Sequence, residues 1–295
     1  SLVIATDISR SMLAEDVLPS RLGRAKREAR RLVQDLDGDR LGLIAFAGRS
    51  YILTPLTVDG GAVSLYLDGL DPDLASEGGT DLAATLRVTE IFHSLQGESS
   101  RAGLPTVFVR LTGCPLRCAW CDTDYAFSGG ETMTLGEVLV EVARHGARQV
   151  CVTGGEPLAQ KACLPLLRAL CDAGYSVSLE TSGALDIAQV DARVSRIMDL
   201  KAPASGEADR NHWENLDRLN AGDEIKIVLA DEADYDWAKS VLGARQLDAI
   251  CPVLLSPVAG KLDAKRLAEW VLRDKLPVRV QLQLHKLIWG SERGR

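Results

Sequence analysis

The sequence lacks the features that would place this protein in a membrane or outside the cell. No apolar run approaches the roughly eighteen residues of a membrane-spanning helix, and no signal peptide is visible at the start. The seven cysteines are an odd number with three of them clustered, which argues against a disulfide framework and fits a reducing, cytoplasmic compartment. A net charge of −7 offers no general basic surface. We therefore expect neither a membrane nor a nucleic-acid partner.

The composition is that of an ordinary soluble α/β protein. Hydrophobic residues make up 46% and charged residues 25% of the 295 residues, a length that allows two domains. The chain begins at Ser1, already within a strand-like run, so its start reads as a fragment. No Pro- or Ser-rich linker separates the two halves, so the domain boundary, between residues 85 and 86, is drawn from motifs alone.

Residues 1–85 have the pattern of an incomplete doubly wound α/β unit. Hydrophobic periodicity predicts strands and helices there. The strands are expected over 2–6, 40–47 and 51–56, and the helices over 21–36 and 61–70.

Short polar residues follow the first of these strands. The spacing Asp7-x-Ser9-x-Ser11, with Thr80 further on, resembles the metal-ion-dependent adhesion site of von Willebrand factor A domains, whose oxygen ligands hold Mg²⁺. The strand and the aspartate loop that complete that family's sheet do not follow. The resemblance therefore implies a truncated fragment, and a Mg²⁺-dependent adhesion module is kept as one alternative function.

A tight loop with three cysteines, Cys114, Cys118 and Cys121, follows the strand-like run 106–111. Thiolates at C-x3-C-x2-C spacing suit zinc or an iron–sulfur cluster. Structural zinc normally takes four protein ligands, and no further Cys or His lies close by in sequence. A cubic [4Fe–4S] cluster on three cysteines leaves one iron open for S-adenosylmethionine. The loop favours this cluster over zinc or inert cysteines, and it resembles the signature of radical S-adenosylmethionine enzymes.

Strand and helix patterns alternate after residue 86, which predicts a parallel sheet with right-handed crossovers. Strands are expected over 107–111, 150–153, 177–180, 197–200, 224–229, 250–255 and 278–284. Helices are expected over 135–144, 158–173, 211–219, 233–242 and 264–274. Polar or Gly-rich motifs follow several strands, beginning at Thr153, Glu180, Asp199 and Ser256. Because active sites lie at the carboxyl ends of parallel strands, we expect one site there.

Residues 86–295 resemble the 7-carboxy-7-deazaguanine synthase family. The motifs that carry the resemblance are Ser94–Ser99, Phe108–Arg110, Cys121–Asp124, Thr153–Pro157 and Leu284–Gly290. The resemblance implies a partial radical-SAM (β/α) barrel. It also implies conversion of 6-carboxy-5,6,7,8-tetrahydropterin to 7-carboxy-7-deazaguanine with loss of ammonia, in queuosine and deazapurine biosynthesis. Flavodoxin or ferredoxin would supply the electron, and members of the family commonly form homodimers.

The resemblance assigns roles to individual residues. The catalytic cysteines would hold the cluster, and Thr123 would bind Mg²⁺. Residues expected at S-adenosylmethionine are Trp120, Cys121, Asp122, Gly154, Gly155, Glu156, Glu180, Ser182, Asp199 and Lys201. Residues expected at the pterin are Leu95, Gln96, Gly97, Glu98, Arg110, Thr153 and His285. Glu156 would accept from the ammonium of the cofactor, and Arg110 would clamp the substrate carboxylate.

Each assignment has a structural alternative. Gly154-Gly155-Glu156 is also the pattern of a strand-to-helix turn, and a lone histidine such as His285 on a strand is often a core or edge residue. An activase that installs a glycyl radical on a partner protein shares the cysteine spacing. Such an activase would not need the Gln96, Glu98 and Arg110 set.

Overall fold

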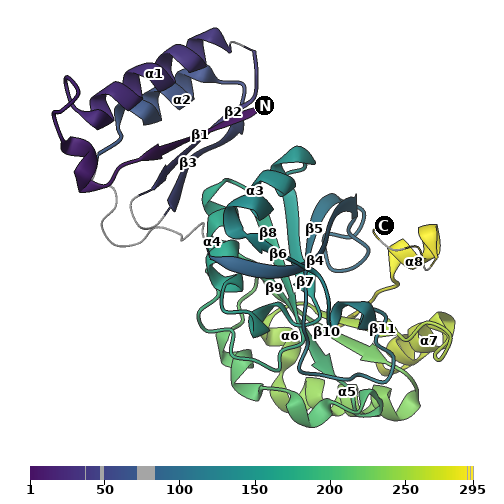
Figure 1. Cartoon of the computed structure of the whole chain (residues 1–295). Helices are drawn as coiled ribbons and strands as arrows, with labels where there is room; N and C mark the ends of the chain where they lie inside the picture. The colour runs from purple at the N-terminus through teal and green to yellow at the C-terminus, as the bar shows by residue number, and fades with distance from the viewer. Residues whose placement is uncertain (37, 47–49, 72–83, 291, 293, 295) are drawn as a thin grey trace.

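The structure is a computed structural model that describes residues 1–36, 38–46, 50–71, 84–290, 292 and 294. Within them the chain forms two sheets, one of three strands near the N-terminus and one of nine strands after residue 84 (Figure 1). No helix among these residues combines the length and apolarity needed to cross a bilayer.

The small sheet is a half sheet with helices on one face. Strand β1 (Leu2–Asp7) pairs in parallel with β2 (Leu41–Phe46), which pairs antiparallel with β3 (Ser50–Thr57). Helices α1 (Arg21–Asp35) and α2 (Gly60–Asp68) cover one face (Figure 1). Buried side chains from both helices and from β2 form a separate core, which includes Leu22, Val33, Leu43, Val63 and Leu67. The five elements expected from the sequence are confirmed.

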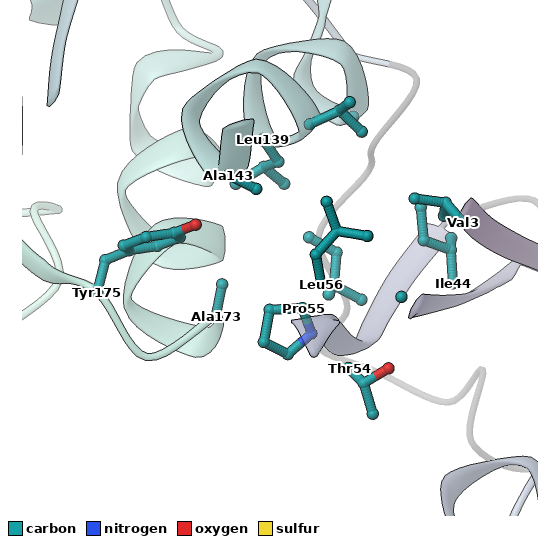
Figure 2. A pocket seen from close by; sticks show the side chains of 13 residues that line it. Val3, Ile44, Thr54, Pro55, Leu56, Leu139, Ala143, Ala173 and Tyr175 are labelled. Atoms are coloured by element: carbon teal, nitrogen blue, oxygen red, sulfur yellow. The ribbon is translucent and has the colours of Figure 1, made fainter. Parts of the chain in front are cut away.

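The other face of the half sheet lies against the larger unit. Ile44 and Ile52 pack against the main core, and the Arg40 guanidinium donates to the carbonyl of Ala143, 3.1 Å away. An apolar cleft remains between the two, lined by Val3 and Leu56 on one side and by helix α3 (Leu135–Arg144) on the other (Figure 2).

The large sheet has the strand order β12-β11-β10-β9-β8-β7-β5-β4-β6. Seven of its strands are parallel: β5 (Pro105–Leu111), β7 (Gln149–Gly154), β8 (Ser176–Thr181), β9 (Ser195–Lys201), β10 (Glu224–Leu229), β11 (Val253–Pro257) and β12 (Arg279–Val280). Each new parallel strand is added at the same edge, as in a barrel that stays open. The mixed α/β fold and the partial barrel are confirmed.

The two strand pairings at the other edge are antiparallel, unlike the all-parallel sheet expected. Strand β4 (Thr85–Leu95) pairs antiparallel with β5 and with β6 (Glu131–Thr134). Its burial alternates only at its start, and polar residues such as Glu90 and His93 interrupt it. An edge strand of this kind gives no clear period-two signal.

The α-helices after β6 lie between strands, except for α8, which follows the last strand, β12. They are α3, α4 (Cys163–Asp172), α5 (Glu232–Arg245), the short α6 (Leu247–Ile250), α7 (Ala264–Asp274) and α8 (Leu284–Trp289). The predicted capping box is present at α3, where the Thr134 hydroxyl accepts from the backbone of Glu137 and the Glu137 carboxylate accepts from that of Thr134.

Four segments differ from the sequence prediction. Residues 157–159 form a 3₁₀ turn and α4 begins only at Cys163, while residues 213–218 are 3₁₀ rather than α-helix. Ile250 ends α6, so β11 starts at Val253. The strand expected over 278–284 shrinks to Arg279–Val280, because Leu284 begins α8. In the last two segments the apolar run was too short to distinguish strand from helix by periodicity.

Candidate active site

The cysteine loop follows β5 and is held by backbone contacts and one buried anchor. Leu116 is 1% exposed. The Gly113 amide donates to the Ala126 carbonyl at 2.7 Å, and the Ala119 amide donates to the Ser205 carbonyl at 2.9 Å. Ser205 belongs to the turn after β9, so the loop is tied to a strand three places away in the sheet. The loop is therefore fixed by the barrel.

Cys114, Cys118 and Cys121 are half-buried free thiols. Burial raises the pKa of all three, and the Cys121 thiol raises the pKa of Cys114 and Cys118 further, while Lys201 opposes this for each. Three grouped thiols suit iron, which displaces their protons on binding, and the nearby Lys201 ammonium favours their thiolate form. Among the described residues no three Cys, His, Asp or Glu side chains are already arranged to hold one metal ion. A cubic cluster does not need that, because each cysteine binds a different iron.

Gly154 and Gly155 make room for the cysteine loop. Gly154 has φ +158°, and a Cβ there would lie 2.2 Å from the Leu111 carbonyl oxygen. A Cβ on Gly155 would lie 2.4 Å from the Gly113 carbonyl oxygen and 2.6 Å from Cys114 Cβ. These neighbours are mostly backbone and cannot move aside. The close approach that requires glycine here is to the cluster loop itself.

Glu156 is fully buried, and its carboxylate is occupied by the chain. It accepts from the Ser182 amide at 2.7 Å, from the Ser182 hydroxyl at 2.5 Å and from the Thr181 hydroxyl at 2.9 Å. The Leu158 amide also donates to it. These bonds join the ends of β7 and β8. The geometry thus favours Glu156 as the residue that fixes this wall of the site.

Four charged side chains, from Glu98 through Lys226 and Asp199 to Lys201, form a row of alternating charge. Lys226 on β10 donates to the Glu98 carboxylate, and its ammonium also lies 3.8 Å from Asp199. Asp199 pairs with Lys201 at 3.1 Å. Burial alone would raise the pKa of Glu98, but Lys226 and Gln283 outweigh it and the pKa lies below its ordinary value. The pKa of Lys226 is raised despite burial, because Glu98 and Asp199 face it. Both groups are therefore held charged.

Lys226 was missed by the sequence reasoning. A lysine between the buried Ile225 and Ile227 is the signal that could have found it, since a charge inside an apolar strand needs a partner.

Glu180 links two residues expected at the substrate. Its carboxylate accepts from the Gln96 amide at 3.2 Å and from the Thr153 hydroxyl at 2.8 Å. The Gln96 oxygen accepts from the Glu98 amide, and Gln283 donates to Glu98 at 2.6 Å. The structure thus brings the predicted polar set together at one place. Leu95, the last residue of β4, directly precedes Gln96.

Arg110 is paired with a residue that the sequence did not point to. Its Nε donates to Glu90 at 2.7 Å, and the Tyr125 hydroxyl donates to the same Glu90 oxygen at 2.8 Å. Burial would lower the pKa of Arg110, but Tyr125 and Glu90 raise it above its ordinary value. The Phe92 and Tyr125 rings lie 5.8 and 5.9 Å from the guanidinium carbon.

The C-terminal segment covers the 96–99 turn. The Leu284 amide donates to the Gly97 carbonyl at 2.9 Å, and a Cβ on Gly97 would lie 1.9 Å from Nδ1 of His285. His285 stands in the first turn of α8, not on a strand as expected. Burial lowers its pKa. The imidazole is therefore neutral and rests on the turn that carries the predicted substrate residues.

Asp122 and Thr123 lie at the other side of this segment. Lys286 donates to Asp122 at 2.6 Å, and the Thr123 hydroxyl donates to the same carboxylate at 2.9 Å. Burial would raise the pKa of Asp122, but Lys286 and Thr123 lower it well below its ordinary value. The ring of Trp120 faces the Lys261 ammonium at 5.3 Å.

Three of the four adhesion-type residues, Asp7, Ser9 and Ser11, lie together at the end of β1. The Ser9 amide donates to Asp7 at 2.7 Å, and the hydroxyls of Ser9 and Ser11 lie 2.9 Å apart. Thr80 lies outside the described residues. Metal binding by this set stays a prediction of the sequence resemblance.

Comparisons with known proteins agree with this geometry. Residues 108–202 match the Radical SAM superfamily, and residues 2–105 match the von Willebrand factor type A domain. The open barrel and the three-cysteine loop thus define a radical S-adenosylmethionine protein, whose cofactors are a [4Fe–4S] cluster and S-adenosylmethionine.

Full-length relatives narrow the class. The 7-carboxy-7-deazaguanine synthase of Chlorobaculum tepidum is 50% identical over 212 residues, which span 71% of this chain and 96% of that protein. The synthase of Koribacter versatilis is 44% identical over 70% of this chain and 98% of its own length. The crystal structure of QueE from Escherichia coli matches with a TM-score of 0.58 at 28% identity, covering 68% of this chain and 95% of that one. The chain belongs to the 7-carboxy-7-deazaguanine synthase family.

Proposed function

We propose that this chain converts 6-carboxy-5,6,7,8-tetrahydropterin to 7-carboxy-7-deazaguanine, with contraction of the pterin ring and loss of ammonia. The observation that carries the proposal is the placement of Gln96, Glu98 and Thr153 in one hydrogen-bonded group around the Glu180 carboxylate. Relatives that match about 70% of this chain over nearly their whole length are named as synthases of this product. The division of the chain at residue 85 is part of the same proposal.

The substrate residues present complementary groups to a pterin. The Gln96 amide and the Glu98 carboxylate offer donors and acceptors for the ring edge, and Arg110 offers a fork for the carboxylate. Leu95 and Gly97 contribute backbone, Thr153 a hydroxyl, and His285 a neutral imidazole. Because Lys226 keeps the Glu98 carboxylate ionised, both of its oxygens are hydrogen-bond acceptors for N–H groups of the ring.

The cofactor would lie against the ends of β7, β8 and β9. The residues proposed to line it are Trp120, Cys121, Asp122, Gly154, Gly155, Glu156, Glu180, Ser182, Asp199 and Lys201, and Glu156 also holds Ser182 in place. Oδ1 of Asp199 is buried without a hydrogen-bond partner among the described residues, which suits an acceptor for a cofactor hydroxyl. When bound, the cluster and S-adenosylmethionine supply a 5′-deoxyadenosyl radical that takes a hydrogen atom from the substrate.

Thr123 is the proposed protein ligand of Mg²⁺. Its hydroxyl already donates to Asp122, which leaves the oxygen lone pairs as acceptors. Mg²⁺ keeps several waters and takes substrate oxygens, so one protein oxygen is enough. We also propose flavodoxin or ferredoxin as the electron donor, a homodimer, and a cytoplasmic location.

An anaerobic assay tests the function. Protein with a reconstituted cluster is given S-adenosylmethionine, Mg²⁺, dithionite and 6-carboxytetrahydropterin, and products are read by mass spectrometry. Formation of 7-carboxy-7-deazaguanine is expected. Formation of 5′-deoxyadenosine without it would keep the radical chemistry and overturn the pterin assignment, leaving the glycyl-radical activase. Neither product, from protein shown to carry the cluster, would overturn the proposal.

A further inference from the structure

Glu90 faces the proposed carboxylate clamp from the neighbouring strand. Glu90 on β4 and Arg110 on β5 are direct partners in the antiparallel ladder. The Glu90 side chain is 22% exposed and the Arg110 side chain 16%, so both are largely shielded from water. A charge pair in this setting is held by its geometry and is weakly screened.

The bond between them uses only one edge of the guanidinium. Glu90 accepts from Nε of Arg110, and within the described part of the chain neither terminal nitrogen of Arg110 makes a hydrogen bond. A carboxylate is bound best by two parallel N–H donors of one guanidinium. Arg110 therefore keeps its two terminal nitrogens available for a ligand while Glu90 fixes the plane of the group.

The same oxygen of Glu90 also ties this clamp to the cluster loop. Tyr125 donates to it at 2.8 Å, and Tyr125 lies in the 3₁₀ turn 124–126 that directly follows the cysteines. That turn is held in place, because its Ala126 carbonyl accepts from Gly113. One carboxylate thus sets the position of the substrate clamp relative to the loop that carries the cluster.

We propose that Glu90 is a positioning residue that aims Arg110 at the carboxylate of the substrate and, through Tyr125, keeps that carboxylate in register with the cluster loop. This inference rests on the proposed function. It predicts that Glu90 governs recognition of the carboxylate and not of the pterin ring, which contacts other residues. It also predicts that a misplaced substrate leaves the radical unused more often.

The test compares two ligands on four proteins. Binding of 6-carboxytetrahydropterin and of tetrahydropterin without the carboxylate is measured by calorimetry on the cluster-loaded wild type, Glu90→Ala, Glu90→Gln and Tyr125→Phe. Glu90→Ala should raise the Kd of the carboxylated ligand about tenfold and the Kd of the other ligand less than twofold. A misoriented charged hydrogen bond costs about that factor in affinity. Glu90→Gln, whose amide oxygen can still accept from Nε, should stay within about threefold of wild type.

Turnover supplies the second readout. Glu90→Ala and Tyr125→Phe should raise the ratio of 5′-deoxyadenosine to deazaguanine product, with the KM for S-adenosylmethionine unchanged. Glu141→Ala removes a carboxylate that pairs with Arg144 on the surface of α3, and serves as the matched control with no change expected. Equal weakening of both ligands by Glu90→Ala, or no weakening, would overturn the positioning role. Wild type that binds neither pterin would instead overturn the proposed function, and this inference with it.

Discussion

The ammonium of Lys226 on β10 donates to the Glu98 carboxylate, although the two residues are 128 positions apart in the sequence. Their side chains are 13% and 9% exposed. The bond closes the row of charges that continues through Asp199 to Lys201, and so connects the proposed substrate turn to the side of the barrel proposed for the cofactor.

Replacing this lysine should therefore damage both stability and turnover. Lys226→Met leaves Glu98 and Asp199 as buried, uncompensated charges, and we expect a loss of about 3 kcal/mol in the free energy of unfolding. The KM for the pterin should rise at least about tenfold, because Glu98 loses the partner that holds it. Lys226→Arg should recover much of the stability. Chemical denaturation and steady-state kinetics measure the two effects, and unchanged kinetics in a folded Lys226→Met would contradict the assignment.

The same pair gives the fold a dependence on acid. The folded-state pKa of Glu98 lies below its ordinary value of 4.5, so its ionised form contributes stability that is complete above that value and is lost as pH falls through the folded pKa. Between about pH 5 and pH 3, wild type should lose more stability than Glu98→Gln, which has no carboxyl to protonate there. Melting temperatures recorded across this range test it. Parallel curves for the two proteins would show that Glu98 contributes nothing to the acid sensitivity.

Gly155 should be required for loading the cluster. Gly155→Ala would place a methyl group against the Gly113 carbonyl and Cys114 Cβ, so the loop must shift to admit it. We expect the iron content after reconstitution to fall below about half of the wild-type value, in a protein that remains folded. The matched control is Gly243→Ala in helix α5, where a Cβ meets no atom within 4 Å and where alanine is the better helix former. Equal iron in both variants would refute the steric argument.

Removing the half sheet should leave the chemistry intact. None of the residues proposed at the site lies before Ala84, so a chain that starts at Ala84 should retain its kcat and KM within about twofold. Ala84 is kept because its carbonyl accepts from the Leu135 amide at the start of α3. Deletion uncovers the apolar surface of the larger unit against which Ile44 and Ile52 pack, so a lower melting temperature or a greater tendency to aggregate is expected. A large fall in kcat would show that residues 1–83 act in catalysis.

Local sequence pattern determined much of this protein. The spacing of Cys114, Cys118 and Cys121, the glycines after β7 and the series of polar residues after successive strands all depend on neighbours within a few positions. Parallel topology brings the carboxyl ends of strands together whatever their separation along the chain. The sequence alone therefore predicts a site at those ends. The helices α3 and α7 were likewise predictable, because a capping box or an amphipathic face marks them locally.

The tertiary structure alone decided which side chains meet. The pairing of Lys226 with Glu98 and the direct opposition of Glu90 and Arg110 follow from strand order and register, which no local pattern contains. The occupation of Glu156 by Thr181 and Ser182, and the start of α8 at Leu284 over the Gly97 turn, are long-range contacts of the same kind. The local sequence specifies which chemical groups follow each strand. Packing between distant segments decides which of these groups are already hydrogen-bonded to the chain and which are left to bind a ligand.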